Sequence, residues 1–455
     1  MSQFHSPRDD IHPAFQLSHA SPRRLIHLIP DELAEAVPEH PLFSFSKTEH
    51  LRDGFTDVSA KCFGNAANRA AWWLVENLGL PSSFETVAYI GSNDIRYLLF
   101  MFGIIKVGYK MLFTSPRNNL DGHPNVLEKS NCQVFLSASD SHTDIRPILE
   151  RRPMRTLTAP ALNELLHSPV EPYPYTKSFE DARHDPCLVL HTTGSTSLPK
   201  PIVWKNGMLA TYEAWRLVPS VGNYVPTTEV YQQATCAYTS MPLFHTSGIN
   251  AAITWALCLG VTLVYGDPNV PPNAAYVARM HQFAGVNATM GAPSIYGEPG
   301  SREEWLEGLK RMYYVVASGA PLSHKAGDTI TRYSRVIGNL VATETANPPR
   351  LAPALEDWEY FYWHPTHSGI ELRPDPDGDS ALHELFIVHW DPDLEPFQGV
   401  FYAFPEPRKW SMNDLDGVIA LSNGERLTPP LMGMALASCP QVISTSCPST
   451  RSLTF

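Results

Sequence analysis

The sequence predicts an α/β protein with parallel sheets, followed by a small antiparallel β-subdomain. Short apolar runs alternate with helical patterns over most of the chain, and this β-α-β alternation implies parallel strands joined by right-handed crossovers. From about Trp358 the pattern changes to short strands in a background rich in Pro and Asp. With 455 residues, the chain is long enough for two or three domains and a large buried core.

The N-terminal elements follow from the spacing of apolar residues. Residues 1 to about 45 are expected to form an irregular lead-in broken by prolines, in which Asp31 caps only a short helix over 32–36. Five elements are then expected in order: a strand at 55–59, a helix at 60–78, a strand at 87–90, a helix at 95–106 capped by Asn93 and Asp94, and a strand at 110–113.

The alternation resumes in the middle of the chain. We expect a strand at 187–190, a helix at 206–215, apolar segments at 254–265 and 286–290, and strands at 313–316 and 335–340. The antiparallel strands are expected at 360–363, 369–372 and 384–389. Polar loops follow three of the parallel strands, and ligands bind at the carboxyl ends of strands in open α/β sheets.

The composition argues against several classes of protein. A net charge of -12 is unsuited to a nucleic-acid surface, so an anionic ligand would need local donors. No apolar run approaches the roughly 18 residues of a membrane span, and the N-terminal residues lack the apolar core of a signal peptide. The seven cysteines include no CxxC pair, which favours reduced, buried thiols. We therefore expect a cytoplasmic protein.

A polar stretch, LHTTGSTSLPKP, follows the strand predicted at 187–190. It fails the P-loop pattern, because no glycine precedes its lysine and a proline follows it. Small residues still allow backbone N–H groups to converge on a phosphate, and hydroxyls and a lysine add donors. The candidate phosphate-binding residues are Thr192, Thr193, Gly194, Ser195, Thr196 and Lys200. The alternative is a solvated surface loop, because the same residue types are common in loops.

The motifs around this stretch resemble the adenylate-forming superfamily, which includes acyl-CoA synthetases, luciferases and adenylation domains of nonribosomal peptide synthetases. Residues 192–200 are similar to that family's phosphate loop, with Ser197 in place of its second glycine. Four further matches follow in the family's order: PLFHTSG at 242–248, SGAPL at 318–322, ATET at 342–345 and WSMNDL at 410–415. The resemblance covers roughly residues 40 to 433. FTSPR at 113–117 and two later segments resemble fungal adenylation domains that open nonribosomal-peptide-synthetase-like carboxylate reductases.

The resemblance implies an architecture and a reaction. The architecture is two stacked parallel-sheet α/β subdomains plus a small antiparallel β-subdomain, with residues 1–409 as the adenylate-forming core and 410–455 as hinge and residual lid. The reaction is ATP-dependent activation of a carboxylic acid to an acyl-adenylate in secondary metabolism, with Mg2+ as the metal. The expected partners are the acid and a thiol acceptor, either CoA or a separate carrier protein, but no nucleic acid.

The resemblance also assigns roles to individual residues. Lys200 and its loop would hold the β- and γ-phosphates, and Glu344 would bind Mg2+ through carboxylate oxygens. Thr343 would donate to the α-phosphate or the acid, so Thr343, Glu344 and Lys200 are the implied catalytic residues. Asp414 would accept the ribose hydroxyls, and Gly319 and Ala320 would pass close to adenine and substrate. Taken alone, Glu344 could be a surface carboxylate and Asp414 a helix N-cap.

The implied acid pocket follows the PLFHTSG motif. His245 helps to shape this pocket in the family, although a histidine is more often structural than functional. No acidic residue occurs between Phe244 and Trp255 to pair with an amino group, which favours an aryl, fatty or keto acid over an amino acid. The implied pocket residues are His245, Ile249, Asn250, Met290, Pro293, Ser294 and Gly319.

Two departures from the family pattern bear on activity. Leu340 stands where the family has an adenine-stacking aromatic residue, and Val341 replaces its glycine. The hinge arginine has no counterpart after Leu415, and no lysine follows Lys409, although the family's lid carries a catalytic lysine. We therefore expect a largely missing lid and slow or absent adenylation. The alternatives are an inactive remnant or a non-catalytic nucleotide- or acid-binding protein; an unrelated ATP-using enzyme is disfavoured by the missing P-loop pattern.

Overall fold

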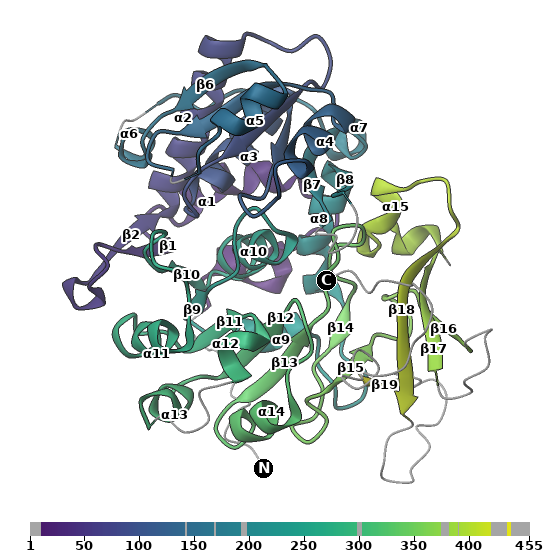
Figure 1. Ribbon diagram of the computed structural model, residues 1–455. Coiled ribbons are helices and arrows are strands. Elements are labelled where there is room, and N and C mark those ends of the chain that lie inside the picture. Colours follow the sequence, from purple (N-terminus) through teal and green to yellow (C-terminus); the bar gives the residue numbers. More distant parts are fainter. Residues whose placement is uncertain are drawn as a thin grey trace.

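Three β-sheets organise the chain (Figure 1). The computed structural model describes residues 11–141, 143–167, 170–192, 198–297, 303–374, 382–389, 391–419 and 435–437. Two largely parallel sheets lie one above the other in Figure 1, and an antiparallel sheet lies to their right. The predicted α/β class, with two parallel-sheet subdomains and a small antiparallel subdomain, is therefore confirmed.

The upper sheet has six strands in the order β6-β5-β3-β4-β7-β8. Its first five strands are parallel, and β8 runs antiparallel to β7 at one edge. The strands are β3 (Thr86–Ile90), β4 (Lys110–Phe113), β5 (Cys132–Ala138), β6 (Arg155–Ala159), β7 (Pro186–His191) and β8 (Pro201–Lys205).

The lower sheet has seven strands in the order β13-β12-β11-β9-β10-β1-β2. All neighbours are parallel except β1 and β2. The strands are β1 (Pro41–Ser46), β2 (Phe55–Ser59), β9 (Cys236–Thr239), β10 (Thr262–Tyr265), β11 (Ala288–Gly291), β12 (Tyr314–Ser318) and β13 (Arg335–Asn339).

Helices connect these strands, and one continuous apolar core joins both parallel sheets. Every residue of α3 is buried, as expected for a helix covered on all sides. No helix within the described ranges is long and apolar enough to cross a bilayer. The α-helices are α1 (Ile29–Ala36), α2 (Ala60–Leu78), α3 (Arg96–Val107), α4 (Gly122–Lys129), α5 (Arg146–Arg151), α6 (Leu162–Leu166), α7 (Phe179–Ala182), α8 (Asn206–Ala214), α9 (Thr227–Tyr231), α10 (Thr246–Ala251), α11 (Ala274–Phe283), α12 (Pro293–Gly297), α13 (Glu303–Leu309), α14 (His324–Ile330) and α15 (Val400–Ala403).

The antiparallel sheet has the strand order β14-β15-β19-β18-β17-β16. The long strand β18 pairs with both β17 and β19. The division of the chain at 409/410 into core and hinge stays a prediction, and β18 crosses that boundary. The strands are β14 (Arg350–Leu351), β15 (Tyr360–Trp363), β16 (Ile370–Pro374), β17 (Leu382–Val388), β18 (Lys409–Ile419) and β19 (Ala435–Ala437).

Two local expectations were wrong. The proline-rich lead-in contains β1, which pairs with β10 and β2 because its Pro41 stands at the first strand position, where proline is tolerated. Asp31 lies inside the first turn of α1 instead of capping a later helix, and its carboxylate accepts from buried Lys106 at 2.5 Å. The apolar segment expected at 254–265, for which no element type was predicted, is divided between a π-helical segment (Ala252–Cys258) and β10.

Candidate active site

The loops after strands of both parallel sheets meet at one place. Leu243 follows β9 and Asn93 follows β3, and the Leu243 backbone N–H donates to Asn93 Oδ1 at 2.8 Å. The indole of Trp204, in β8, donates to the backbone carbonyl of Thr343, after β13, at 2.7 Å. Because β3 and β8 belong to one sheet and β9 and β13 to the other, residues far apart in sequence are brought together here. The carboxyl ends of the strands therefore form the candidate site.

The predicted phosphate loop leaves β7 and returns through β8. At its stem, the Thr192 N–H donates to the Lys200 carbonyl at 3.1 Å, and the Lys200 N–H donates to Thr192 Oγ1 at 3.2 Å. Thr192 is half-buried and Lys200 is exposed. The predicted residues Thr193, Gly194, Ser195 and Thr196 lie outside the described residues.

A tight turn after β13 presents Thr343 and Glu344. The Ala342 N–H donates to the Ala346 carbonyl at 3.2 Å, and the Thr345 N–H donates to the Ala342 carbonyl at 3.3 Å. Ala346 has φ 55°, in the left-handed region that costs a residue with a Cβ about 1 kcal/mol or more. Trp204 adds its bond to the Thr343 carbonyl. Backbone and core contacts thus fix this turn without a ligand.

The Glu344 carboxyl is largely withdrawn from solvent. Burial raises the pKa of the Glu344 carboxyl, whereas its own backbone N–H and the Lys200 ammonium act to lower it. Thr343 and Glu344 are adjacent in one turn, and Trp204 bonds this turn to the strand that follows Lys200. The catalytic roles of Thr343, Glu344 and Lys200 stay predictions. Among the described residues no group of three or more His, Cys, Asp or Glu could hold a metal ion. A single carboxylate suits Mg2+ that takes its other ligands from phosphate and water.

A buried histidine joins the phosphate-loop stem to the FTSPR segment. His191 Nε2 accepts from the Ser115 N–H at 3.0 Å and lies 3.2 Å from Asn118 Nδ2. Because a backbone N–H can only donate, Nε2 is the acceptor, and Nδ1–H faces the Thr192 carbonyl at 3.1 Å. Burial lowers the pKa of His191. The ring is therefore a neutral link between the loops after β4 and β7.

His245 precedes α10, at the end of the PLFH segment. Burial, with smaller contributions from His191 and Arg117, lowers the pKa of His245 to about 4. The Gly248 of the same motif is structural, because a Cβ there would lie 2.2 Å from the Pro242 carbonyl oxygen. The motif therefore packs α10 tightly against its own entry loop and keeps His245 uncharged at neutral pH.

The other predicted acid-pocket residues have different environments. Ile249 and Met290 belong to the hydrophobic core, and Asn250 Oδ1 accepts from Thr254 Oγ1 at 3.0 Å. In α12, Pro293 is half-buried and Ser294 is exposed. Their assignment to an acid pocket stays a prediction.

Gly319 and Ala320 are exposed at the end of β12. Gly319 has φ +95°, and a Cβ there would meet no protein atom within 4 Å. Glycine is therefore required here by the backbone conformation, and the protein leaves the space beside it open.

The sequence did not predict a series of hydrogen bonds between polar side chains that begins at Ser318, next to Gly319. Ser318 Oγ lies 3.0 Å from Ser247 Oγ and accepts from Asn339 Nδ2 at 3.3 Å. Arg350 Nη2 donates to Asn339 Oδ1 at 2.7 Å, so one chain of hydrogen bonds joins α10, β12, β13 and β14. The one signal for it in the sequence is a polar residue at the last position of each of the apolar strands β12 and β13, Ser318 and Asn339.

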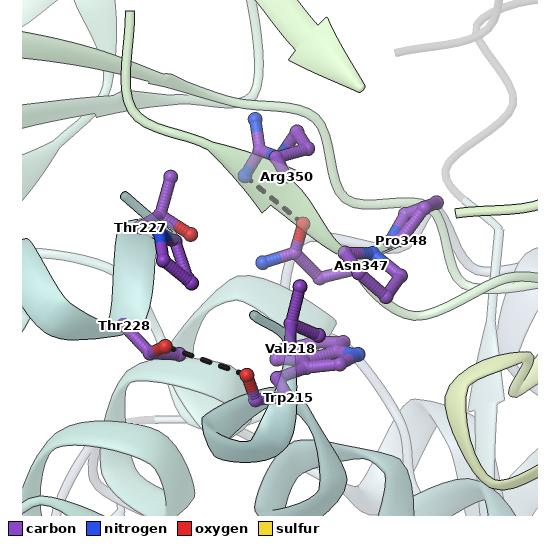
Figure 2. Close-up of a pocket in the computed structure, with 9 residues that line it drawn as sticks. Trp215, Val218, Thr227, Thr228, Asn347, Pro348 and Arg350 are labelled. Atoms are coloured by element: carbon purple, nitrogen blue, oxygen red, sulfur yellow. Dashed lines mark hydrogen bonds between the residues drawn. The ribbon is translucent and has the colours of Figure 1, made fainter. Parts of the chain in front are cut away.

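Arg350 also lines a small pocket (Figure 2). Its guanidinium donates to Asn347 at 3.0 Å and to the Gly338 carbonyl at 2.6 Å, and no described carboxylate pairs with it. Burial lowers the pKa of Arg350 to about 10. The pocket is lined by Trp215, Val218, Pro226, Thr227, Thr228, Asn347, Pro348, Pro349 and Arg350.

Two further predicted positions lie toward the antiparallel sheet. Asp414 lies within β18, so the helix N-cap alternative is wrong for it, and its side chain is outside the described part of the structure. Leu340 is half-buried and packs beside Trp363 and Leu385. Whether Leu340 contacts adenine stays a prediction.

Solved structures define the class of fold. The inhibitor-bound N-terminal domain of FACL13 from Mycobacterium tuberculosis matches 87% of this chain and 97% of that chain, with TM-score 0.65 and 16% identity. The Klebsiella oxytoca NpsA N-terminal subdomain, in complex with 3-hydroxyanthranilyl-AMSN, matches 91% of this chain and 98% of that chain, with TM-score 0.58 and 17% identity. The fold is thus that of the N-terminal domains of adenylate-forming enzymes.

The family follows from the sequence. Residues 31–346 match the model of the AMP-binding enzyme family, and the chain belongs to that family. It is 35% identical over 398 residues to an isocyanide synthase-NRPS hybrid, crmA, of Aspergillus fumigatus, covering 86% of this chain. It is 31% identical over 445 residues to a carboxylic acid reductase of Neurospora crassa, covering 92% of this chain. The chain spans 26% and 42% of the lengths of these two relatives.

Proposed function

We propose that this chain activates a carboxylic acid with ATP, giving an acyl-adenylate and pyrophosphate. The observation that carries the proposal is the hydrogen bond from Trp204 to the Thr343 carbonyl at 2.7 Å, which joins the strand after Lys200, in one parallel sheet, to the turn that carries Glu344, beside the other. A cation for phosphate oxygens and a carboxylate for a hard metal ion are the two charges this chemistry needs.

In this reaction a carboxylate oxygen of the acid attacks the α-phosphorus of ATP in line, and the bond from that phosphorus to the β-phosphate oxygen breaks. Lys200 and the phosphate loop bind the β- and γ-phosphates, which leave as pyrophosphate. The Glu344 carboxylate would hold Mg2+, and the ion when bound would supply neutralisation of phosphate charge. Thr343 donates to the α-phosphate or to the acid, and Asp414 accepts the ribose hydroxyls. Most of the rate enhancement comes from positioning and charge neutralisation.

The substrate is an aryl, fatty or keto acid in a secondary-metabolite pathway. The absence of an acidic side chain from residues 244–255, where an amino group would need a partner, supports this class. The names of the two fungal relatives, an NRPS hybrid and a carboxylic acid reductase, also fit it. The acyl group then passes to a thiol of CoA or of a separate carrier protein.

The test is ATP–pyrophosphate exchange over a panel of aryl, fatty, keto and amino acids. Exchange that depends on an acid and falls strongly in Lys200→Ala and in Glu344→Ala supports the proposal. Tight binding of ATP by the folded chain without exchange for any acid would overturn it, and would favour a non-catalytic nucleotide-binding protein.

A further inference from the structure

The hydrogen bond from Trp204 to Thr343 joins the two halves of the candidate site. Trp204 lies in β8, four residues after Lys200, and its side chain is completely buried. Its Nε1–H donates to the Thr343 carbonyl at 2.7 Å across 139 residues of sequence. The strand that leaves the phosphate loop is therefore bonded directly to the turn that carries Glu344.

The acceptor of this bond belongs to the peptide group between Thr343 and Glu344. The carbonyl of that peptide accepts from Trp204, and the N–H of the same peptide belongs to Glu344. Because a peptide group is rigid, a rotation of its plane would break the bond to Trp204 and reorient the backbone of Glu344. The direction of the Glu344 carboxylate is thus linked to the bond that Trp204 makes.

The indole is itself held by the core. Its ring lies 6.3 Å from the ring of Tyr212 in α8, and Tyr212 contacts Trp215 edge-on with ring centroids 4.7 Å apart. A buried ring between packed neighbours has few alternative rotamers, so its N–H keeps one direction.

We propose that Trp204 is a positioning residue, whose indole N–H fixes the Thr343–Glu344 peptide against the strand that follows Lys200. In this way Trp204 sets the spacing between the Glu344 carboxylate and the Lys200 ammonium. The proposal rests on the proposed function and adds to it a residue remote from the reacting atoms.

The test uses two ways of removing the donor from the full chain. Trp204→Phe keeps an aromatic ring, and 3-benzothienylalanine at position 204 keeps the bicyclic shape but lacks the N–H. The matched control is Trp215→Phe, because Trp215 is similarly buried, contacts the same tyrosine, and its Nε1 has no hydrogen-bond partner in the described structure.

Three quantities are measured for each variant. They are the affinity for Mg-ATP by calorimetry, the Mg2+ concentration that half-saturates ATP–pyrophosphate exchange, and the amide hydrogen exchange of each peptide. We expect both position-204 variants to bind Mg-ATP about tenfold more weakly and to need more Mg2+. Faster hydrogen exchange should be confined to peptides that contain residues 342–346, and Trp215→Phe should change none of the three.

Two results would overturn the inference. One is a 3-benzothienylalanine protein with wild-type Mg-ATP affinity and wild-type hydrogen exchange at 342–346. The other is faster hydrogen exchange throughout the chain in that protein, which would give Trp204 a role in the core alone. If the wild-type chain shows no ATP–pyrophosphate exchange with any acid, the proposed function fails. The affinity for Mg-ATP and the amide hydrogen exchange at 342–346 still decide the role of Trp204.

Discussion

The two sides of the candidate site are stabilised in different ways. The turn that carries Glu344 is fixed by backbone hydrogen bonds, by buried neighbours and by Trp204. Opposite it, the Lys200 side chain is exposed, and no described residue accepts a hydrogen bond from its ammonium. A preorganised carboxylate needs no rearrangement when a metal binds, whereas an exposed ammonium is completed by the ligand. Under the proposed function, the carboxylate for the metal ion is fixed before ATP binds, whereas the ammonium of Lys200 gains its partner from ATP.

The largest effect is expected from a substitution of Glu344. Glu344→Ala removes the carboxylate proposed to hold Mg2+, so ATP–pyrophosphate exchange should fall about 10²–10³-fold. The control is Glu356→Ala, since Glu356 is an exposed glutamate after the next strand, β14. Equal rates for the wild type and Glu344→Ala would remove Glu344 from the site.

A smaller effect is expected on the phosphate side. Lys200→Met removes one charge-assisted contact, so the affinity for Mg-ATP in calorimetry should fall about tenfold or somewhat more. Lys205→Met, at the end of the strand β8 that follows Lys200, should bind Mg-ATP as the wild type does. A larger loss for Lys205→Met than for Lys200→Met would contradict the assignment of the phosphate side.

A substitution of His191, whose ring joins the loops after β4 and β7, should affect the free energy of unfolding more than the rate of adenylation. His191→Phe leaves the Ser115 N–H without its buried acceptor, and we expect a loss of about 1–3 kcal/mol in the free energy of unfolding. Urea denaturation measures this loss, and His184→Phe, at an exposed histidine in the preceding segment, is the control. An unchanged midpoint for His191→Phe would mean that water replaces the ring nitrogen without cost.

The smallest effect is a dependence of stability on pH. Burial lowers the pKa of His123 to about 4, whereas an unfolded histidine titrates near 6.5. The unfolded chain therefore binds more protons between these values, and the stability contributed by neutral His123 is lost as pH falls from about 6.5 toward 4. We expect His123→Asn to reduce the loss in unfolding free energy between pH 7.5 and 5.5 by about 1 kcal/mol. Parallel curves for wild type and variant would contradict this.

The sequence predicted regular elements better than contacts. The helix at Ala60–Leu78 was predicted to the residue, because its apolar residues recur at helical spacing between a serine N-cap and a terminal glycine. The strand at Pro41–Ser46 was missed, because prolines at 38 and 41 hide a strand that is fixed by its partners β10 and β2.

The site shows the same division. Motifs predicted that Lys200 and Glu344 belong to one site, and this assignment stays a prediction; the structure bonds the strand after Lys200 to the turn that carries Glu344. The bond from Trp204 to Thr343 and the chain from Arg350 to Ser247 could not be predicted, because each depends on how separate elements pack. The spacing of apolar residues predicts helices and strands, and motifs identify candidate site residues. Contacts between elements can be found only from the tertiary structure.

The most direct test of the central claim is a crystal structure of the chain with Mg2+ and ATP. We expect the β- and γ-phosphates on the Lys200 side, Mg2+ on the Glu344 carboxylate, and the bond from Trp204 to Thr343 intact. A nucleotide bound without contact to Lys200 or Glu344 would contradict the account of one site built from the loops of two sheets.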